Sequence, residues 1–166
     1  MKLTALNVLQ LQKENTWDTQ EWIIPLSAAL RGLNAEQADW QPPGGGNTIR
    51  ETLTHLNYYN QRLLNRLKNT PSGSGLPTNE ATFTSGEHPK DSAGWNALLE
   101  EAGRIATELG QALGGLTDSD LEAPYSPANA QVLFGEELAR WMLHDAYHAG
   151  QIVLIRRQQG SWHTEA

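Results

Sequence analysis

The chain has 166 residues, a length that suits one ordinary domain and suffices to bury one continuous hydrophobic core. It carries 12 lysines and arginines against 19 aspartates and glutamates, a net charge of -7, with no run of basic residues. Because binding to phosphates requires clustered positive charge, this balance disfavours nucleic acid as a partner. The absence of cysteine excludes disulfides and thiolate ligands within the chain, so any thiol chemistry needs a thiol from outside.

The N-terminal residues lack the sustained apolar segment of a secretion signal. No apolar run approaches the ~20 residues that span a bilayer. We therefore expect a single domain, residues 1–166, that is soluble, is located in the cytoplasm and has no membrane partner.

Helical periodicity dominates the chain from its first third onward. Pro25 and a stripe of apolar residues at three- and four-residue steps predict a first long helix with a kink or a late start: Trp22, Leu26, Ala29, Leu30 and Leu33. The segment QPPGGGN at 41–47 predicts a loop. Thr48 and Glu51 form a capping-box pattern, which predicts the start of a second helix over about 48–69.

The second half of the chain predicts two more helices. Residues 70–90 contain PSGSGLP and no helical period, which indicates a long crossover. Apolar residues at helical spacing predict a third helix over about 92–113 and a final helix over about 134–159 that ends at Gly160. No strand pattern competes strongly, although 130–134 is ambiguous. Four helices with one apolar face each can bury those faces only against one another, so we expect an all-α fold, a four-helix bundle with a long crossover between helices two and three.

Two histidines, His144 and His148, stand four residues apart on the expected final helix. This spacing places their Cβ atoms roughly 5–6 Å apart on one face, so that both rings can reach one ion. The pair falls between Trp141 and Ile152 on one side and Leu143 and Leu154 on the other, and so we expect it to point towards the core. Burying two adjacent imidazoles without partners costs on the order of a few kcal/mol, which a shared metal would offset. Solvated or hydrogen-bonded histidines are the alternative.

A third ligand has to come from another helix, and His55 is the candidate. His88 falls in the expected crossover, and His163 lies beyond the last expected helix. On the second helix His55 flanks the leucine stripe. This position fits a residue that lines a cleft between helices, and it also fits an ordinary interface histidine.

Two segments, TIRETLTHLNYYNQRLLNRL at 48–67 and LHDAYHAGQIVLIRRQQGSW at 143–162, resemble the DinB/YfiT superfamily of metalloenzymes. In that family a histidine on the second helix and an HxxxH pair on the last helix bind a divalent metal, and HxxxHxGQI is a recurrent motif. The resemblance assigns these roles to His55, His144 and His148. It also implies a four-helix bundle with a long crossover and, in many members, a homodimer, which the Trp-rich and Leu-rich helices favour as well.

The resemblance implies a small-molecule substrate and, by analogy with members of assigned activity, a transferase or isomerase that uses a low-molecular-weight thiol. Three neutral histidines leave a coordination position open, as a catalytic site requires. The ion would lower the pKa of a bound thiol and so favour the thiolate. Among ions that histidine accepts, we place zinc and nickel first, ahead of iron, copper and cobalt.

Two other readings of the site stay open. The site could activate water as a metal-dependent hydrolase, with a carboxylate such as Glu51 or Glu137 taking a proton, although each is more typical of a helix cap or a surface ion pair. The chain could also be a non-catalytic metal-binding stress-response module with a structural ion. Gln151, one turn beyond His148, could orient a ligand imidazole or form a structural hydrogen bond. Asp145 points about 100° away from His144 and is not expected to be a ligand.

Overall fold

The computed structural model describes residues 3–86, 88–126 and 129–162. In this part of the chain the structure is mostly helical, with seven α-helices, one short 3-10 helix and a small two-stranded sheet. The predicted all-α class therefore holds except for the small sheet. Among the described residues, no helix is long and apolar enough to cross a membrane.

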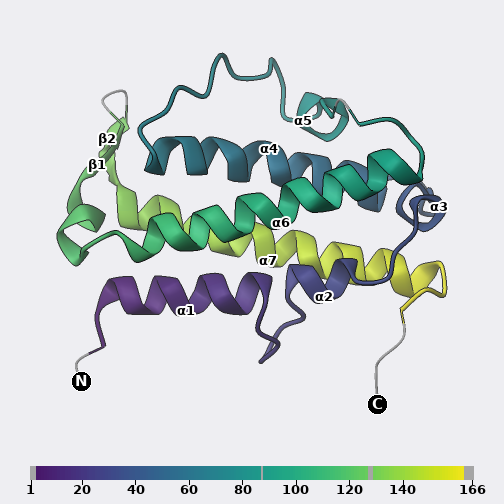
Figure 1. Cartoon of the computed structure of the whole chain (residues 1–166), viewed down its shortest axis with the longest axis horizontal. Helices are drawn as coiled ribbons and strands as arrows, with labels where there is room; N and C mark the ends of the chain where they lie inside the picture. The colour runs from purple at the N-terminus through teal and green to yellow at the C-terminus, as the bar shows by residue number, and fades with distance from the viewer. Residues whose placement is uncertain (1–2, 87, 127–128, 163–166) are drawn as a thin grey trace.

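The long helices run alongside one another (Figure 1). Helix α4 packs against α6 and α7, while α1 packs against α6 and α7 and α2 packs against α7. Their bounds are Ala5–Trp17 for α1, Leu26–Leu30 for α2, Ile49–Leu67 for α4, Ser92–Gly114 for α6 and Phe134–Gln158 for α7. The second, third and fourth predicted helices correspond to α4, α6 and α7, with ends that differ by at most two residues.

The capping box predicted at the start of the second helix is present in α4. The Thr48 backbone N–H donates to Glu51 Oε2 at 2.7 Å, and the Glu51 N–H donates to Thr48 Oγ1 at 3.2 Å. Two N–H groups that have no partner inside the helix are satisfied in this way. At the other end of the fold, Gly160 follows α7 with a φ of 74°, the left-handed conformation expected of a C-terminal stop.

The prediction of a single long first helix was wrong. Helix α1 ends at Trp17, and α2 begins only after Pro25, whose fixed φ suits the position before a helix. Trp22, which we placed on the buried stripe, lies between the two helices and is fully exposed. The late start after Pro25 was the correct alternative. Helix α1 was not predicted. Only three of its residues are buried, so it has a narrow apolar face: Leu6, Leu9 and Thr16.

The segment between α4 and α6 passes over the outer side of α4 (Figure 1) and is not entirely irregular. It contains α5, Ala81–Thr84, which packs against α4. A one-turn helix, α3, Ala35–Ala38, also lies outside the predicted elements. Arg50 on α4 connects α3 to the segment before α6. Its guanidinium donates to both carboxylate oxygens of Asp39, directly after α3, at 2.6 and 2.8 Å, and to the carbonyl of Pro89 at 3.3 Å.

The ambiguous segment 130–134 lies mostly in a strand. Strand β1, Pro124–Ser126, pairs antiparallel with β2, Asn129–Leu133, and α7 begins directly after β2. A 3-10 helix, η1, Asp118–Glu122, precedes the sheet. The sheet lies at one end of the helical layers (Figure 1).

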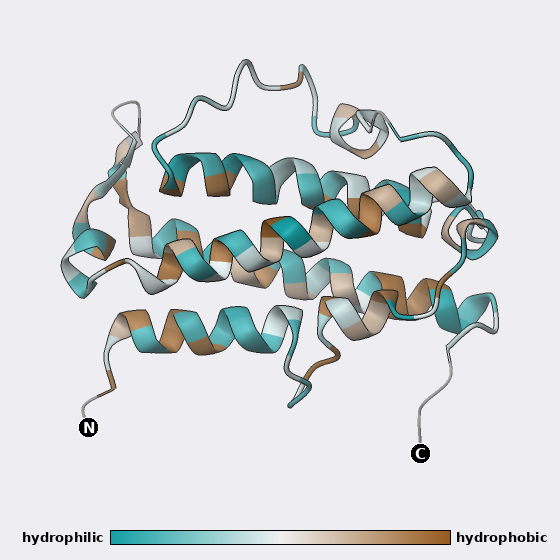
Figure 2. Cartoon of the chain, viewed as in Figure 1, coloured by the Kyte–Doolittle hydropathy of each residue, from teal (hydrophilic) through white to brown (hydrophobic). Residues whose placement is uncertain are grey.

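Apolar residues recur along each long helix (Figure 2), and those that face neighbouring helices form two core clusters. The first cluster joins α2 to the first part of α4 and α6 and to the last part of α7, around Leu26, Leu53, Trp95 and Ile152. The second joins α1 to the opposite parts of the same helices, around Leu9, Leu64, Leu109 and Leu138. The three candidate metal ligands are polar and are not among the apolar residues of either cluster.

Candidate metal centre

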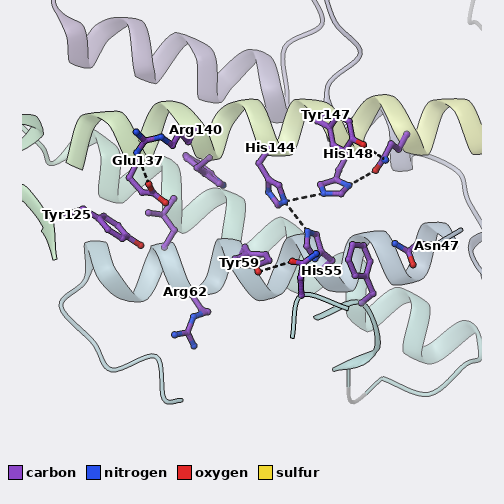
Figure 3. Close-up of a pocket in the computed structure, with 15 residues that line it drawn as sticks. Asn47, His55, Tyr59, Arg62, Tyr125, Glu137, Arg140, His144, Tyr147 and His148 are labelled. Carbon is purple, nitrogen blue, oxygen red and sulfur yellow. Dashed lines mark hydrogen bonds and ion pairs between the residues drawn. The ribbon is translucent and has the colours of Figure 1, made fainter. Parts of the chain in front are cut away.

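His55 on α4 and the pair His144 and His148 on α7 point toward one another across the gap between the two helices (Figure 3). His55 Nε2 lies 3.0 Å from His144 Nε2, and His148 Nε2 lies 3.2 Å from the same atom. One ring nitrogen from each residue lies within 4.8 Å of the others, and these three residues form a group that could hold a metal ion. The i,i+4 spacing on α7 and the opposing residue on α4 thus place three imidazoles at one point.

The spacing of the three nitrogens suits one ion. Two nitrogens each about 2.0–2.1 Å from a tetrahedral zinc-like ion are about 3.3 Å apart, and in octahedral geometry they are about 2.9 Å apart. The two Nε2 separations at His144, 3.0 and 3.2 Å, fall between these values. The donor set consists of neutral nitrogen ligands, which zinc, nickel, iron, copper and cobalt all accept.

A hydrogen bond to Thr82 fixes the tautomer of His55. Thr82, on α5, donates its hydroxyl proton to the Asn79 carbonyl, so its oxygen accepts from His55 Nδ1–H at 2.6 Å. The proton of the neutral ring is therefore on Nδ1, and Nε2 presents a lone pair to the site. The short helix of the crossover thus orients one of the candidate ligands.

Gln151 is the partner of His148 Nδ1. The Gln151 amide nitrogen donates to the Tyr147 hydroxyl at 3.0 Å, and its Oε1 faces the ring of His148. His148 Nδ1–H donates to that oxygen at 2.6 Å. Gln151 thus forms a hydrogen bond with one of the candidate ligands, and Nε2 of His148 is left with its lone pair.

His144 differs from the other two histidines in its surroundings. His144 is half-buried, whereas His55 and His148 are buried, with 2% and 6% of each residue exposed. Its Nδ1 faces Asp145 Oδ1 at 3.7 Å. Asp145 is buried, and burial raises the pKa of its carboxyl above the ordinary value, against the opposing effects of His144 and Asn60. The prediction that Asp145 points away from the site missed this contact, although Asp145 is not one of the three grouped residues.

The electrostatics of the site favour neutral rings. Burial, followed by the nearby His148 and His144 rings, lowers the pKa of His55 from 6.5 to about 4. Burial and His144 lower the pKa of His148 to about 4 as well, although its hydrogen bond with Gln151 acts in the opposite direction. At neutral pH both rings are therefore uncharged, the form in which imidazole binds a metal.

The site opens into a cavity of about 700 Å³ between α4 and α7. Aromatic rings form its walls near the histidines: Phe83 of α5 stacks on His55 with ring centroids 4.0 Å apart, and Tyr59 meets His55 edge-on at 5.0 Å. Away from the histidines the cavity is lined by polar and charged side chains, among them Arg62, Tyr125, Glu137 and Arg140 (Figure 3).

The remaining candidates from the sequence lie elsewhere or make other contacts. His88 Nε2 lies 3.3 Å from Glu101 Oε2, outside this cavity, and His163 lies outside the described residues. Glu51 is the helix cap described above. Glu137 does line the cavity, but it is paired with Arg140 at 3.2 Å.

Sequence reasoning missed the residues that support the rings from other elements. Thr82 and Phe83 come from a segment that we expected to be a loop, and Asn60 and Trp141 carry no signal in the sequence beyond general helix packing. One local contact precedes α5: Thr78 Oγ1 accepts from the Ala81 N–H at 3.2 Å, a side-chain hydrogen bond in the turn before the helix.

Comparison with known proteins agrees with the motifs. A family model described as DinB superfamily matches residues 25–152, which is more than half of the chain and includes all three candidate ligands. No curated protein matches the chain, and no solved structure does. On this match, the chain belongs to the DinB superfamily.

Proposed function

We propose that this chain is a divalent-metal-dependent enzyme, a transferase that acts with a low-molecular-weight thiol cosubstrate at His55, His144 and His148. One observation supports this most: three ring nitrogens meet at the wall of a cavity of about 700 Å³. Structural zinc sites are closed by four protein ligands, whereas catalytic sites keep a position open to solvent or substrate. The superfamily includes metal-dependent enzymes, which agrees with this reading. Zinc and nickel are the ions we propose.

The chain's own residues would have distinct tasks in such a reaction. Thr82 and Gln151 hold two rings with Nε2 directed inward. Phe83 and Tyr59 cover the ring of His55 and limit the access of water. A divalent ion at this site would lower the pKa of a thiol bound to it, so that the thiol would react as thiolate near neutral pH. The nucleophile comes from outside, because the chain has no cysteine.

The far part of the cavity supports a polar small-molecule substrate. Arg140 and Glu137, on α7, form an ion pair there, and Tyr125 of β1 lines the same region. Glu137 is also the observation that favours a second candidate, metal-dependent hydrolysis, because a carboxylate in the same cavity is a potential base. Because Glu137 is paired with Arg140, its carboxylate is a poorer base, and hydrolysis is a weaker proposal than the thiol reaction.

The test begins with elemental analysis of the purified full-length protein, followed by loading with zinc or nickel. Cysteine and glutathione are then supplied with an aryl halide electrophile, and loss of free thiol is followed. We expect turnover that His144→Ala abolishes and that His88→Ala, a histidine outside the cavity, leaves unchanged. A protein that binds the metal and hydrolyses esters without consuming thiol would favour the hydrolase. Metal binding with neither activity would favour the non-catalytic module.

We also propose a symmetric homodimer. Leu143 and Leu154 are 70% and 56% exposed, and with Tyr147 and Gly150 they form one stripe along the outer face of α7. A two-fold interface places the same patch of both subunits face to face, and an apolar stripe of this kind can cover its own copy. Light scattering should give a dimer mass, and Leu154→Glu should give a monomer. Leu11→Glu, on the exposed face of α1, is the matched control; a monomeric wild type would remove the proposal.

Three broader expectations stay predictions: a single domain over residues 1–166, a location in the cytoplasm, and a four-helix bundle with a long crossover. For the last of these, α4, α6 and α7 would be three of the four helices. Helices α1 and α2 together would supply the fourth, since both pack along α7. The segment between α4 and α6 would be the crossover.

A further inference from the structure

The Nδ1 atoms of the three histidines face three different groups. Those of His55 and His148 are held by short hydrogen bonds, each 2.6 Å long. The Nδ1 of His144 instead faces Asp145 Oδ1 at 3.7 Å. That oxygen is completely buried and has no hydrogen-bond partner among the described residues. A buried, unpaired carboxylate oxygen is costly, so its position beside a ring nitrogen calls for an explanation.

A chain of hydrogen bonds fixes which atoms of Asp145 are free. The indole N–H of Trp141 can only donate, and it donates to Asn60 Oδ1. The amide group of Asn60 must therefore turn its Nδ2 toward Asp145, where it donates to Oδ2 at 2.9 Å. When Asp145 is ionised, its Oδ1 is left as an acceptor directed at the ring of His144. Each hydrogen bond in the series from Trp141 through Asn60 to Asp145 therefore has a fixed donor and a fixed acceptor.

The tautomer of His144 matters because its Nε2 lies between the other two. His55 and His148 carry their protons on Nδ1, so both direct Nε2 lone pairs at His144 Nε2. Without an ion, a proton on His144 Nε2 is favoured, since it can be shared with those acceptors. A metal can bind there only when that proton has left, and a neutral ring then carries its proton on Nδ1.

We propose that Asp145 is the positioning residue of His144: its Oδ1 accepts the Nδ1 proton and leaves Nε2 free for the ion. This inference rests on the proposed metal site. The tautomer exchange moves one proton from Nε2 to Nδ1 through solvent, so the charge of the ring does not change. A closer approach of less than about 1 Å brings the pair within ordinary N–H···O distance. His144, the most exposed of the three rings, has room for that movement.

The variant Asp145→Asn tests these donor and acceptor roles, because it replaces an acceptor that faces His144 with a donor. Trp141 still holds Asn60, whose Nδ2 requires an acceptor, so the new amide must direct its oxygen there and its NH₂ at His144. The ring then accepts at Nδ1 and keeps its proton on Nε2, the wrong tautomer for binding. We expect zinc affinity to fall about 10- to 100-fold, the usual effect of removing the partner of a ligand histidine.

The double variant Asn60→Asp with Asp145→Asn should restore binding. The carboxylate at position 60 then accepts from both Trp141 and the amide NH₂ at position 145. The amide oxygen is turned back toward His144 Nδ1. We expect most of the lost zinc affinity to return, a rescue that a loss of packing alone would not show. Asn60→Asp by itself sets two carboxylates face to face and should lower the melting temperature of the metal-free protein.

The experiment is a zinc titration against a chromophoric chelator near neutral pH, with a metal-free melt of each variant. Asp39→Asn, which removes the same charge from an ion pair away from the site, should leave the zinc affinity unchanged. NMR of the ring nitrogens of zinc-loaded wild type should find the His144 proton on Nδ1. This NMR measurement uses only the wild type, so it tests the proposal even if Asp145→Asn does not fold.

The outcomes separate the two proposals. A wild type that takes up no zinc, nickel or cobalt would overturn the metal site and this inference with it. A wild type that binds zinc, with Asp145→Asn equally tight, would overturn only the role of Asp145. The same follows if the double variant binds no better than the single variant, or if the His144 proton is found on Nε2 in the loaded protein.

Discussion

The substitution His148→Ala should separate metal binding from folding. His148 supplies one of three ring nitrogens, and two remaining ligands hold an ion far more weakly than three. The two core clusters contain none of the three histidines. We therefore expect the variant to lose metal binding and any activity while it stays folded and helical.

The magnitude follows from linkage. A ligand present at 100 times its dissociation constant stabilises the folded state by about 2.7 kcal/mol. For a chain of this size, each kcal/mol shifts the melting temperature by about 2–4 °C, so saturating metal should raise it by about 5–11 °C in the wild type. Twelve large apolar side chains are almost fully buried, each contributing about 1.5–3 kcal/mol, and these do not depend on the ion.

In the metal-free state His148→Ala has opposing effects. It removes the hydrogen bond to Gln151, worth about 0.5–1.5 kcal/mol, and some packing. It also removes a ring that is buried without charge beside two others, which offsets part of that loss. We expect the metal-free melting temperature to change by no more than a few degrees.

The assay is a circular-dichroism melt of wild type and variant, each with chelator and with excess zinc. His88→Ala, which alters a half-buried histidine outside the cavity, should keep the full zinc-dependent shift. A wild-type shift in His148→Ala would show that His148 is not a ligand. Loss of helical signal at room temperature in both metal-free samples would show a structural ion instead and would favour the non-catalytic module.

Two further changes probe the scaffold and the site. In Gly94→Ala the new Cβ would lie 2.0 Å from the Pro89 carbonyl oxygen, so we expect the free energy of unfolding to fall by about 1–3 kcal/mol. In Gly103→Ala the new Cβ has no atom within 4 Å, so we expect the free energy of unfolding to rise by about 0.5–1 kcal/mol. Urea denaturation measures both changes. Equal effects of the two substitutions would contradict the packing argument. In the metal-free protein the unfolded state takes up protons below pH 6.5, whereas folded His55 and His148 do so only near pH 4, so the unfolding free energy should fall as the pH drops between these values. A metal-free protein equally stable across this range would contradict the lowered pKa values.

The elements found from sequence were those with strong periodicity or clear punctuation. Helix α4 has a capping box at its start, α6 has a continuous apolar face, and α7 ends at Gln158, two residues before Gly160. The HxxxH spacing on α7 carries its own geometry, because residues four apart share a face in any helix. The pair His144 and His148 could therefore be recognised from the sequence. The need for a third ligand on another helix named His55 as the candidate, and the family resemblance assigned it the same role.

Other features depend on contacts that a linear pattern does not carry. Trp22 matched the helical stripe, yet Pro25 starts α2 after it and leaves it exposed. Asp145 lies about 100° from His144 on the helix, and this angle alone says that it faces elsewhere. Its carboxylate nonetheless reaches the ring of its neighbour, because Asn60 on α4 holds it there. Such placement requires knowledge of which helix lies opposite.

The site and the core therefore use different interactions. The core clusters require only apolar side chains at helical spacing, which many sequences satisfy. The three rings depend on polar partners of defined direction: the hydroxyl of Thr82 and the amide of Gln151 each accept one proton from one nitrogen. A substitution such as Thr82→Val would leave the cores intact and release the tautomer of His55. Substitutions among the hydrogen-bond partners of the histidines should therefore lower the metal affinity of this protein far more than its stability. A series of such variants, measured for both metal affinity and free energy of unfolding, can show this directly.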